Sequence, residues 1–341
     1  MLNTVYRLVA PGRIEVEFSD IDLLKEDVLV RPTHLSICHA DQRYFQGLRA
    51  TDILKQKLPM ALIHEAIGEI VWDPKGEFEA GERVVMIPNT PMEEDSVIAE
   101  NYLRTSKFRA SGFDGFMQDV VNMRRDRIIR VPRNINPFVA AFTELVSVSV
   151  HAIDRFDKIA HERRKTVGIW GDGNLGYITA IFFKAMFPEV KLCIFGLDEN
   201  KLSDFTFADD TFSITSIPDD LSIDHAFECV GGEGSPKAIN QIIDYINPEG
   251  TISILGVSEN PVAINTRMIL EKGLRMFGSS RSGRKDFEKT IALYQSNPEI
   301  VEYLQNIIGA TVNVHTVEDM KKAFELDRQN AFGKTIMIWN K

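Results

Sequence analysis

The chain has 341 residues and a formal net charge of −10, with 44% hydrophobic and 26% charged residues. This length suggests about two domains, each large enough to form its own core. The negative charge argues against nucleic acid or an anionic membrane as the main partner, because both would repel the protein. Only 3 cysteines are present, too few and too scattered for a disulfide framework. With no membrane-spanning apolar run and no signal-peptide profile at the start, we expect a cytoplasmic protein.

The first part of the chain is predicted to be rich in β-structure. Apolar and polar residues alternate in the manner of short strands, with Pro and Gly turns between them. The predicted strands cover residues 5–18, 27–36, 67–72, 83–87, 115–122 and 127–131. Residues 88–112 carry little periodicity and predict a long loop or lobe. The segment 138–152 then reads as an apolar helix interrupted by Thr143 and Glu144.

A glycine-rich turn opens the second part of the chain. The apolar run 167–170 predicts a strand, the turn carries Gly171, Gly173 and Gly176, and residues 177–187 predict a buried helix. Strand, glycine turn and helix in this order are typical of dinucleotide binding, because the glycines let the backbone approach a pyrophosphate at a helix N-terminus. Asn174 and Leu175, inside the turn, are expected to contact the dinucleotide too.

Strands and helices alternate beyond this turn. Strands are predicted at 191–195, 211–214, 223–230, 251–256 and 274–278, with helices at 236–246 and 266–272. Such alternation predicts a parallel, doubly wound sheet and an α/β fold. Cys229, Val230 and Gly256, at the ends of predicted strands, are further expected dinucleotide contacts. The tail, residues 285–341, is predicted to hold two amphipathic helices and a final strand at 335–339, and to pack back against the first domain.

Three separate segments carry residues that can bind a metal. Cys38 is followed by Asp41, His64 and Glu65 are adjacent, and Glu144 lies in the apolar helix. Alone, Cys38 also suits a small core residue, and the His–Glu pair also suits an exposed position. Neighbouring strand residues point to opposite faces, so that pair can meet one metal only through an irregular backbone. A buried glutamate needs a cation, a hydrogen bond or a metal.

Taken together, these motifs resemble the zinc-dependent medium-chain dehydrogenases. The segment from Glu144 to Ala152, Glu-Leu-Val-Ser-Val-Ser-Val-His-Ala, is similar to the sorbitol dehydrogenase branch. The segments 224–232 and 278–281 also match it, and the chain looks closest to the ribulose-5-phosphate reductases. The resemblance covers essentially the whole chain.

The resemblance implies a GroES-like β-rich catalytic domain, residues 1–150 and 285–341, and a Rossmann domain, residues 151–284. It implies one zinc ion, bound by Cys38, His64, Glu65 and Glu144 in some combination, with Asp41 orienting a ligand. Arg281 falls where this branch places a substrate-contacting arginine.

Three departures from the family pattern stand out. Ile63 replaces the glycine that usually precedes the His–Glu pair, and Ala40 replaces a Ser or Thr that relays protons. The four-cysteine structural zinc lobe is missing as well, since no cysteine lies between Cys38 and Cys193.

The resemblance also implies the reaction: reduction of D-ribulose 5-phosphate to D-ribitol 5-phosphate, for CDP-ribitol and teichoic acid or capsule synthesis. A homodimer or homotetramer, and a complex with a cytidylyltransferase, are further expectations. The alternatives are an NAD-dependent polyol dehydrogenase and a non-catalytic dinucleotide-binding protein. A sugar phosphate requires local cations in this acidic protein, and Arg43 and Arg49 are candidates beside Arg281. Arg284 and Lys285 are expected to be solvated.

NADPH is the expected cofactor. An acidic residue that selects NAD lies about 20 residues beyond the glycine turn, at a strand end. Here that place falls on Gly196, so no side chain or negative charge is expected to meet a 2′-phosphate, and Lys201 is in phase to approach it. A shift of two residues would instead put Asp198 on the ribose.

Overall fold

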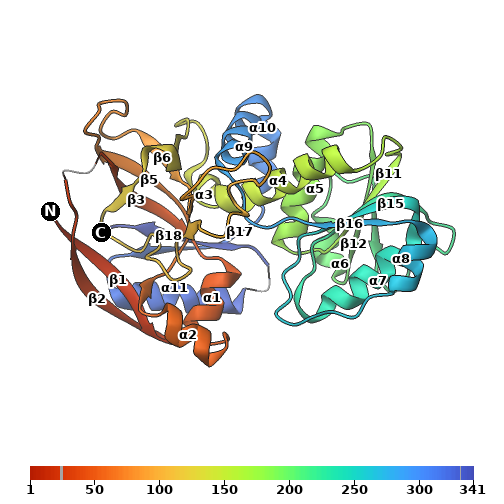
Figure 1. The fold of residues 1–341 in the computed structure, drawn as a ribbon, viewed down its shortest axis with the longest axis horizontal. Helices are drawn as coiled ribbons and strands as arrows, with labels where there is room; N and C mark the ends of the chain where they lie inside the picture. Colours follow the sequence, from red (N-terminus) through yellow and green to blue (C-terminus); the bar gives the residue numbers. More distant parts are fainter. Residues whose placement is uncertain (24–25, 331) are drawn as a thin grey trace. The chain divides into compact units, whose positions relative to one another are not determined.

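The computed structural model describes residues 1–23, 26–330 and 332–341. The chain divides into two compact units: unit 1 comprises Met1–Ser147 and Ser282–Lys341, and unit 2 comprises Val148–Arg281 (Figure 1). Across the described residues, every helix falls short of the length and apolar content that a membrane span requires.

Unit 1 is built on β-sheets. Its main sheet has the strand order β10-β6-β5-β3-β18-β17, with β9 paired to β3, and a smaller sheet has the order β2-β1-β4. The strands are β1 (Leu2–Ala10), β2 (Arg13–Asp20), β3 (Val28–Ser36), β4 (Met60–Ala61), β5 (Glu65–Trp72), β6 (Arg83–Met86), β7 (Asn89–Thr90), β8 (Lys107–Phe108), β9 (Val121–Met123), β10 (Ile128–Arg130), β17 (Ile308–Val314) and β18 (Lys334–Trp339).

The helices of unit 1 come from both ends of the chain. They are α1 (His39–Phe45), α2 (Thr51–Lys57), the short 3₁₀ helix η1 (Arg125–Arg127), α3 (Pro137–Ala141), α9 (Arg284–Ser296), α10 (Pro298–Gln305) and α11 (Val317–Gln329). α4 (Thr143–Ile159) runs from unit 1 into unit 2. The predicted interruption near Thr143 corresponds to Phe142, the C-cap residue of α3, which lies just before α4.

The C-terminal tail completes the main sheet. β18 pairs antiparallel with β3, with Ile336 opposite Ser36, and parallel with β17. The prediction that the tail packs against the first part of the chain is therefore confirmed. The number of tail helices was wrong, because Pro298 occupies the first turn of a separate helix, α10, and so divides the expected segment.

Two other expectations for unit 1 need correction. The segment 115–122 is not one strand, because only β9 and an isolated bridge between Val5 and Gln118 are formed there. The segment 88–112 is mostly turns, as expected, but it also contains the paired strands β7 and β8.

Unit 2 contains a six-stranded sheet with the order β13-β12-β11-β14-β15-β16, in which all pairs are parallel (Figure 1). Its strands are β11 (Thr166–Trp170), β12 (Lys191–Gly196), β13 (Asp210–Ser213), β14 (Ile223–Glu228), β15 (Ile246–Ile254) and β16 (Arg275–Gly278). Its other helices are α5 (Asn174–Met186), α6 (Glu199–Ser203), the 3₁₀ helix η2 (Gly232–Gly234), α7 (Ser235–Tyr245) and α8 (Thr266–Lys272). The order reverses at β11, and such a switch point is where doubly wound sheets bind ligands.

Candidate active site

Three residues of unit 1 form a cluster that can hold a metal ion. Cys38 is the N-cap of α1, His64 precedes β5, and Glu65 is the first residue of β5. One donor atom from each residue lies within 4.8 Å of the others. Because β3 and β5 pair with Ser36 opposite Glu65, the sheet brings these distant segments together.

The backbone turns sharply immediately before His64. Ile63 has a φ of 71°, a left-handed conformation that is rare for a β-branched residue. Its N–H donates to Asp41 Oδ1 at 3.0 Å, and its carbonyl accepts from the Phe116 N–H at 2.7 Å. This is the irregular backbone that adjacent residues need if both are to face one metal.

Asp41 holds the imidazole of His64. Its Oδ2 lies 3.4 Å from His64 Nδ1 and accepts the Cys38 N–H at 3.2 Å. Burial lowers the pKa of His64, but the charges of Asp41 and Cys38 outweigh it and raise this pKa well above its usual value. A carboxylate on Nδ1 leaves Nε2 available for a metal ion, so this contact is compatible with the expectation that Asp41 orients a ligand.

Glu65 is paired with a lysine that the sequence did not single out. Lys334 Nζ lies 2.9 Å from Glu65 Oε2 and donates to the Ile37 carbonyl at 2.7 Å. Both side chains are buried. Lys334 is the first residue of β18, a mostly apolar strand. Its charge at the start of such a strand was the one sequence feature that could have identified it.

Glu144 lies in the first turn of α4 and is buried. Burial raises its pKa to about 7, while the charge of His64 lowers it and that of Glu65 raises it. Among the described residues, the cluster of mutually close donors contains Cys38, His64 and Glu65 without Glu144. Glu144 therefore interacts with the cluster electrostatically.

The donor atoms of the cluster fit zinc. A thiolate, an imidazole and a carboxylate are the ligands that catalytic zinc takes from proteins, and three protein ligands leave a position for substrate. Burial raises the pKa of the Cys38 thiol and the charge of His64 opposes that rise. The buried ammonium of Lys334 compensates part of the negative charge that the cluster carries.

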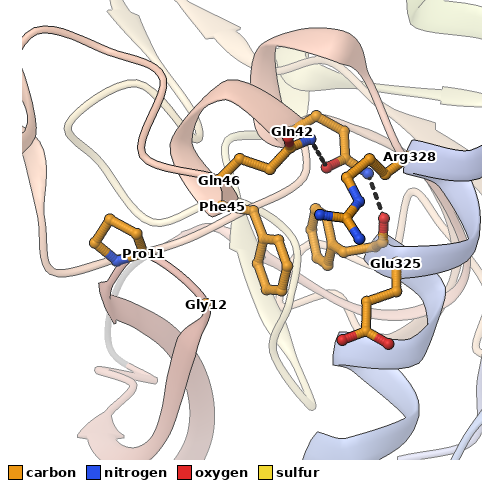
Figure 2. A pocket seen from close by; sticks show the side chains of 8 residues that line it. Pro11, Gly12, Gln42, Phe45, Gln46, Glu325 and Arg328 are labelled. Atoms are coloured by element: carbon orange, nitrogen blue, oxygen red, sulfur yellow. Dashed lines mark hydrogen bonds between the residues drawn. The ribbon is translucent and has the colours of Figure 1, made fainter.

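Helix α1, which carries Asp41, is anchored by contacts of Gln42 and Phe45 with α11 (Figure 2). Gln42 Nε2 donates to the Phe324 carbonyl at 2.7 Å and to Asp327 Oδ2 at 2.8 Å, and the rings of Phe45 and Phe324 stack at 4.4 Å. A surface pocket lined by Pro11, Gln46 and Arg328 lies beside these contacts. The tail of the chain thus fixes both α1 and, through Lys334, Glu65.

The glycine turn of unit 2 has the conformation that close backbone packing requires. Gly171 has a φ of 128°, and a Cβ on Gly176 would lie 1.9 Å from the Gly171 carbonyl oxygen. Gly173 is the N-cap of α5, so Asn174 and Leu175 present backbone N–H groups at the start of that helix. Such N–H groups suit a phosphate.

The remaining predicted dinucleotide contacts follow the carboxyl ends of parallel strands. Gly196 ends β12, Cys229 and Val230 follow β14, and Gly256 follows β15. These ends lie along one edge of the sheet, and Lys201 lies on α6 beyond β12. Asp198 is the N-cap of α6 and accepts the N–H groups of Asn200 and Lys201.

A carboxylate borders Gly196, contrary to expectation. A Cβ at position 196 would lie 2.7 Å from Asp172 Oδ2, which itself accepts the N–H groups of Leu197 and Asp198. The sequence-based expectation that no negative charge lies there was wrong, because Asp172 reaches this place from the glycine turn.

The candidate phosphate-binding arginines lie in different places. Arg281 ends unit 2 with a φ of 58°, Arg43 lies in the last turn of α1, and Arg49 packs over the Tyr44 ring at 5.0 Å. Lys285 is exposed, as expected.

Arg284 is not simply solvated. Its N–H donates to Glu100 Oε1 at 2.7 Å and its guanidinium donates to the carbonyls of Asp126 and Ile128. Arg284 therefore anchors the start of α9.

Comparisons with known proteins identify the family of the chain. Residues 24–133 match the alcohol dehydrogenase GroES-like domain, and residues 203–296 match the zinc-binding dehydrogenase family. The chain is 54% identical over 99% of both chains to ribulose-5-phosphate reductase 2 of Staphylococcus aureus. It is 52% identical, with the same coverage, to the ribulose-5-phosphate reductase of Bacillus spizizenii. The crystal structure of S. aureus TarJ in complex with NADPH aligns over 100% of both chains, with 49% identity and a TM-score of 0.90. The chain belongs to the zinc-binding dehydrogenases, in the group of the ribulose-5-phosphate reductases.

Proposed function

We propose that the protein reduces D-ribulose 5-phosphate to D-ribitol 5-phosphate with NADPH and one zinc ion. The identity of 54% across 99% of the chain to a ribulose-5-phosphate reductase carries this proposal. The cluster of Cys38, His64 and Glu65 and the glycine turn supply the two sites that such a reaction needs.

Each residue of the metal cluster has a separate task. Cys38, His64 and Glu65 would hold the zinc, and Asp41 keeps His64 in the orientation that directs Nε2 to it. Bound zinc polarises a carbonyl group as a Lewis acid, and bound NADPH supplies a hydride. Lys334 keeps Glu65 from being a buried charge without a counter-charge.

Glu144 is our candidate for holding the proton. Burial raises the pKa of its carboxyl, and a carboxyl with a raised pKa suits a general acid or base. Position 40 is an alanine and offers no hydroxyl for a relay. Glu144→Gln should therefore lower kcat about a hundredfold and flatten the pH dependence near neutrality.

The substrate phosphate requires a cation, and arginine offers the planar fork that suits it. Arg281 in unit 2 and Arg43 in unit 1 are our candidates. The wild-type protein should therefore discriminate strongly between a phosphorylated and an unphosphorylated sugar.

The direct test follows NADPH consumption with ribulose 5-phosphate and with ribulose. We expect kcat/KM for the phosphorylated sugar to exceed that for ribulose by at least about a hundredfold, because a charged hydrogen-bond network is lost with the phosphate. Faster oxidation of sorbitol or xylitol with NAD would instead indicate a polyol dehydrogenase. A wild type without activity on any of these would favour a non-catalytic dinucleotide-binding protein.

We further propose that the enzyme works in the cytoplasm as a homodimer or homotetramer. Its product would serve CDP-ribitol and teichoic acid or capsule synthesis, together with a cytidylyltransferase. All three cysteines are free, which suits a reducing compartment. Light scattering of the purified protein, alone and mixed with a cytidylyltransferase, measures both assemblies.

A further inference from the structure

Strand β14 ends at Glu228, a buried residue that has no role in the proposed reaction steps. Glu228 is 0% exposed. Its Oε1 accepts the N–H groups of Val230 at 3.0 Å and Gly231 at 2.8 Å, and its Oε2 accepts the Gly256 N–H at 3.1 Å. A carboxylate only accepts hydrogen bonds, so it suits three converging donors as no other side chain of its size does.

These three N–H groups belong to two different loops. Residues 229–232 follow β14, whereas residues 255–257 follow β15. The loops also contact each other directly, since the Gly232 N–H donates to the Val257 carbonyl at 2.9 Å. A Cβ on Gly256 would lie 2.3 Å from the Gly231 nitrogen and 2.6 Å from Glu228 Oε2. Backbone thus packs on backbone. The Glu228 carbonyl accepts the N–H groups of Leu255 at 2.9 Å and Gly256 at 3.0 Å, and its carboxylate is the side-chain acceptor that both loops share.

The first of these loops borders the glycine turn. A Cβ on Gly171 would lie 3.0 Å from the carbonyl carbon of Cys229, and the Cys229 N–H donates to the Trp170 carbonyl at 2.8 Å. The position of this loop therefore sets one wall of the turn that receives the dinucleotide. Any movement at Cys229 changes the space available beside Gly171.

We propose that Glu228 is a positioning residue for the dinucleotide: it fixes the two loops along the cofactor edge of the sheet before the cofactor arrives. This inference rests on the proposed function only in taking NADPH as the ligand. Preorganised loops lose little conformational entropy on binding, so their release should weaken affinity.

The chain offers a matched control on the same strand. Asp224, at the opposite end of β14, is also a buried carboxylate. It accepts hydrogen bonds from Arg163 Nε at 3.0 Å and from the Lys165 N–H at 2.9 Å. Asp224→Asn and Glu228→Gln each remove one charge and one acceptor from β14, but only Glu228 lies at the cofactor edge.

The experiment measures the Kd for NADPH by fluorescence titration and the Tm of the wild type, Glu228→Gln and Asp224→Asn. In Glu228→Gln an NH₂ group must face at least one N–H donor, so we expect an increase in Kd of roughly tenfold. The KM for NADPH should rise with kcat changed less than twofold. Asp224→Asn should lower Tm at least as much and leave the Kd unchanged.

An unchanged Kd in Glu228→Gln, or an equal rise in both variants, would overturn the proposal. If Glu228→Gln does not fold, Glu228→Asp is measured instead. Its side chain is shorter by one methylene, so the Kd for NADPH should rise about threefold. An unchanged Kd in Glu228→Asp also overturns the inference. A wild type that binds NADPH without reducing ribulose 5-phosphate removes the proposed substrate and leaves the role of Glu228 intact. A wild type that binds no NADPH overturns both.

Discussion

Each unit of the protein buries a glutamate at its candidate site, and the two are stabilised differently. Glu65 in unit 1 faces the ammonium of Lys334 at 2.9 Å. Glu228 in unit 2 faces three backbone N–H groups, at 2.8–3.1 Å. Both side chains have an exposed fraction of 0%. Glu65 therefore has a charged side chain as its partner, whereas the partners of Glu228 are backbone N–H groups.

This difference matches the two tasks. A metal ligand must give a lone pair to a cation, and a lysine side chain can adjust when the cation arrives because it has several rotatable bonds. A residue that shapes a loop needs donors that do not move, and backbone N–H groups provide them. Under the proposed function, Glu65 would exchange Lys334 for the metal ion, whereas Glu228 would keep the same backbone partners.

The largest effect should follow from removing the partner of Glu65. Lys334→Met leaves a buried carboxylate without its counter-charge, which typically costs about 3 kcal/mol or more in unfolding free energy. We expect this loss in the metal-free protein and a smaller loss after zinc is added, because the metal compensates the charge. Urea unfolding with EDTA and with zinc measures both values.

The control for this variant is Lys191→Met, which breaks the half-exposed pair with Asp210. Such surface pairs contribute less than about 1 kcal/mol. Equal destabilisation by the two variants, or no effect of zinc on Lys334→Met, would contradict the account of Glu65.

A smaller effect concerns the acid sensitivity that a buried histidine gives to each unit. His225 in unit 2 accepts the Thr251 N–H on Nδ1 at 3.1 Å, and burial lowers its pKa to about 4. A histidine whose folded-state pKa is lowered stabilises the protein above its unfolded pKa of about 6.5, and this stability is lost as the pH falls toward 4. We expect about 2 kcal/mol to be lost between pH 7 and pH 5.

Thermal unfolding at both pH values checks this, with His225→Gln as the variant that should lose less stability on acidification. His34 in unit 1 also has a pKa lowered to about 4, by burial and by the charge of Arg83. His34→Gln should therefore reduce the acid sensitivity separately. If neither variant changes the slope of stability against pH, the two histidines are not the source of the acid sensitivity.

Arg281 and Arg43 test which unit supplies the cation for the substrate phosphate. Arg281→Gln should raise the KM for ribulose 5-phosphate about tenfold, because a hydrogen bond to a charged group is lost. Its activity on unphosphorylated ribulose should not change. Arg43→Gln is the corresponding variant in unit 1, and an unchanged kcat/KM in either variant removes that arginine from the site.

The smallest effect concerns the choice of dinucleotide. Asp172 borders Gly196, and its charge should disfavour a 2′-phosphate nearby. We expect Asp172→Asn to raise the ratio of kcat/KM for NADPH over NADH by about two- to threefold, because the charge of a half-buried carboxylate is partly screened by solvent. Asn keeps one oxygen for the Leu197 and Asp198 N–H groups. A ratio that falls would show that Asp172 does not oppose NADPH.

Gly196→Asp is a poor test of the same question. A Cβ there would lie 2.7 Å from both Asp172 Cβ and Asp172 Oδ2. Any loss of NADPH affinity would then mix steric displacement of Asp172 with charge repulsion.

Much of the fold follows from local patterns in the sequence. The glycine turn and alternating segments of unit 2 predict a parallel sheet, because its strands are short buried runs between helices. The tail was predicted less well. Residues 285–305 carry a continuous amphipathic pattern, and only Pro298 marks where α9 gives way to α10.

The candidate site shows the same limit. Cys38, His64 and Glu65 are recognisable because their residue types can bind zinc. Lys334 was missed because its role depends on β18 pairing with β3, a contact between residues almost 300 positions apart. Asp172 was missed for a similar reason, since its side chain turns back onto the end of a different strand.

The most direct test of the account is the zinc content of the wild type and of Cys38→Ala, measured by mass spectrometry together with the Kd for NADPH. The two sites are built from different units, so we expect one zinc per wild-type chain and none in Cys38→Ala. Cys38→Ala should show no reductase activity and an unchanged Kd for NADPH. A Cys38→Ala protein that reduces ribulose 5-phosphate at the wild-type rate without zinc would contradict the account.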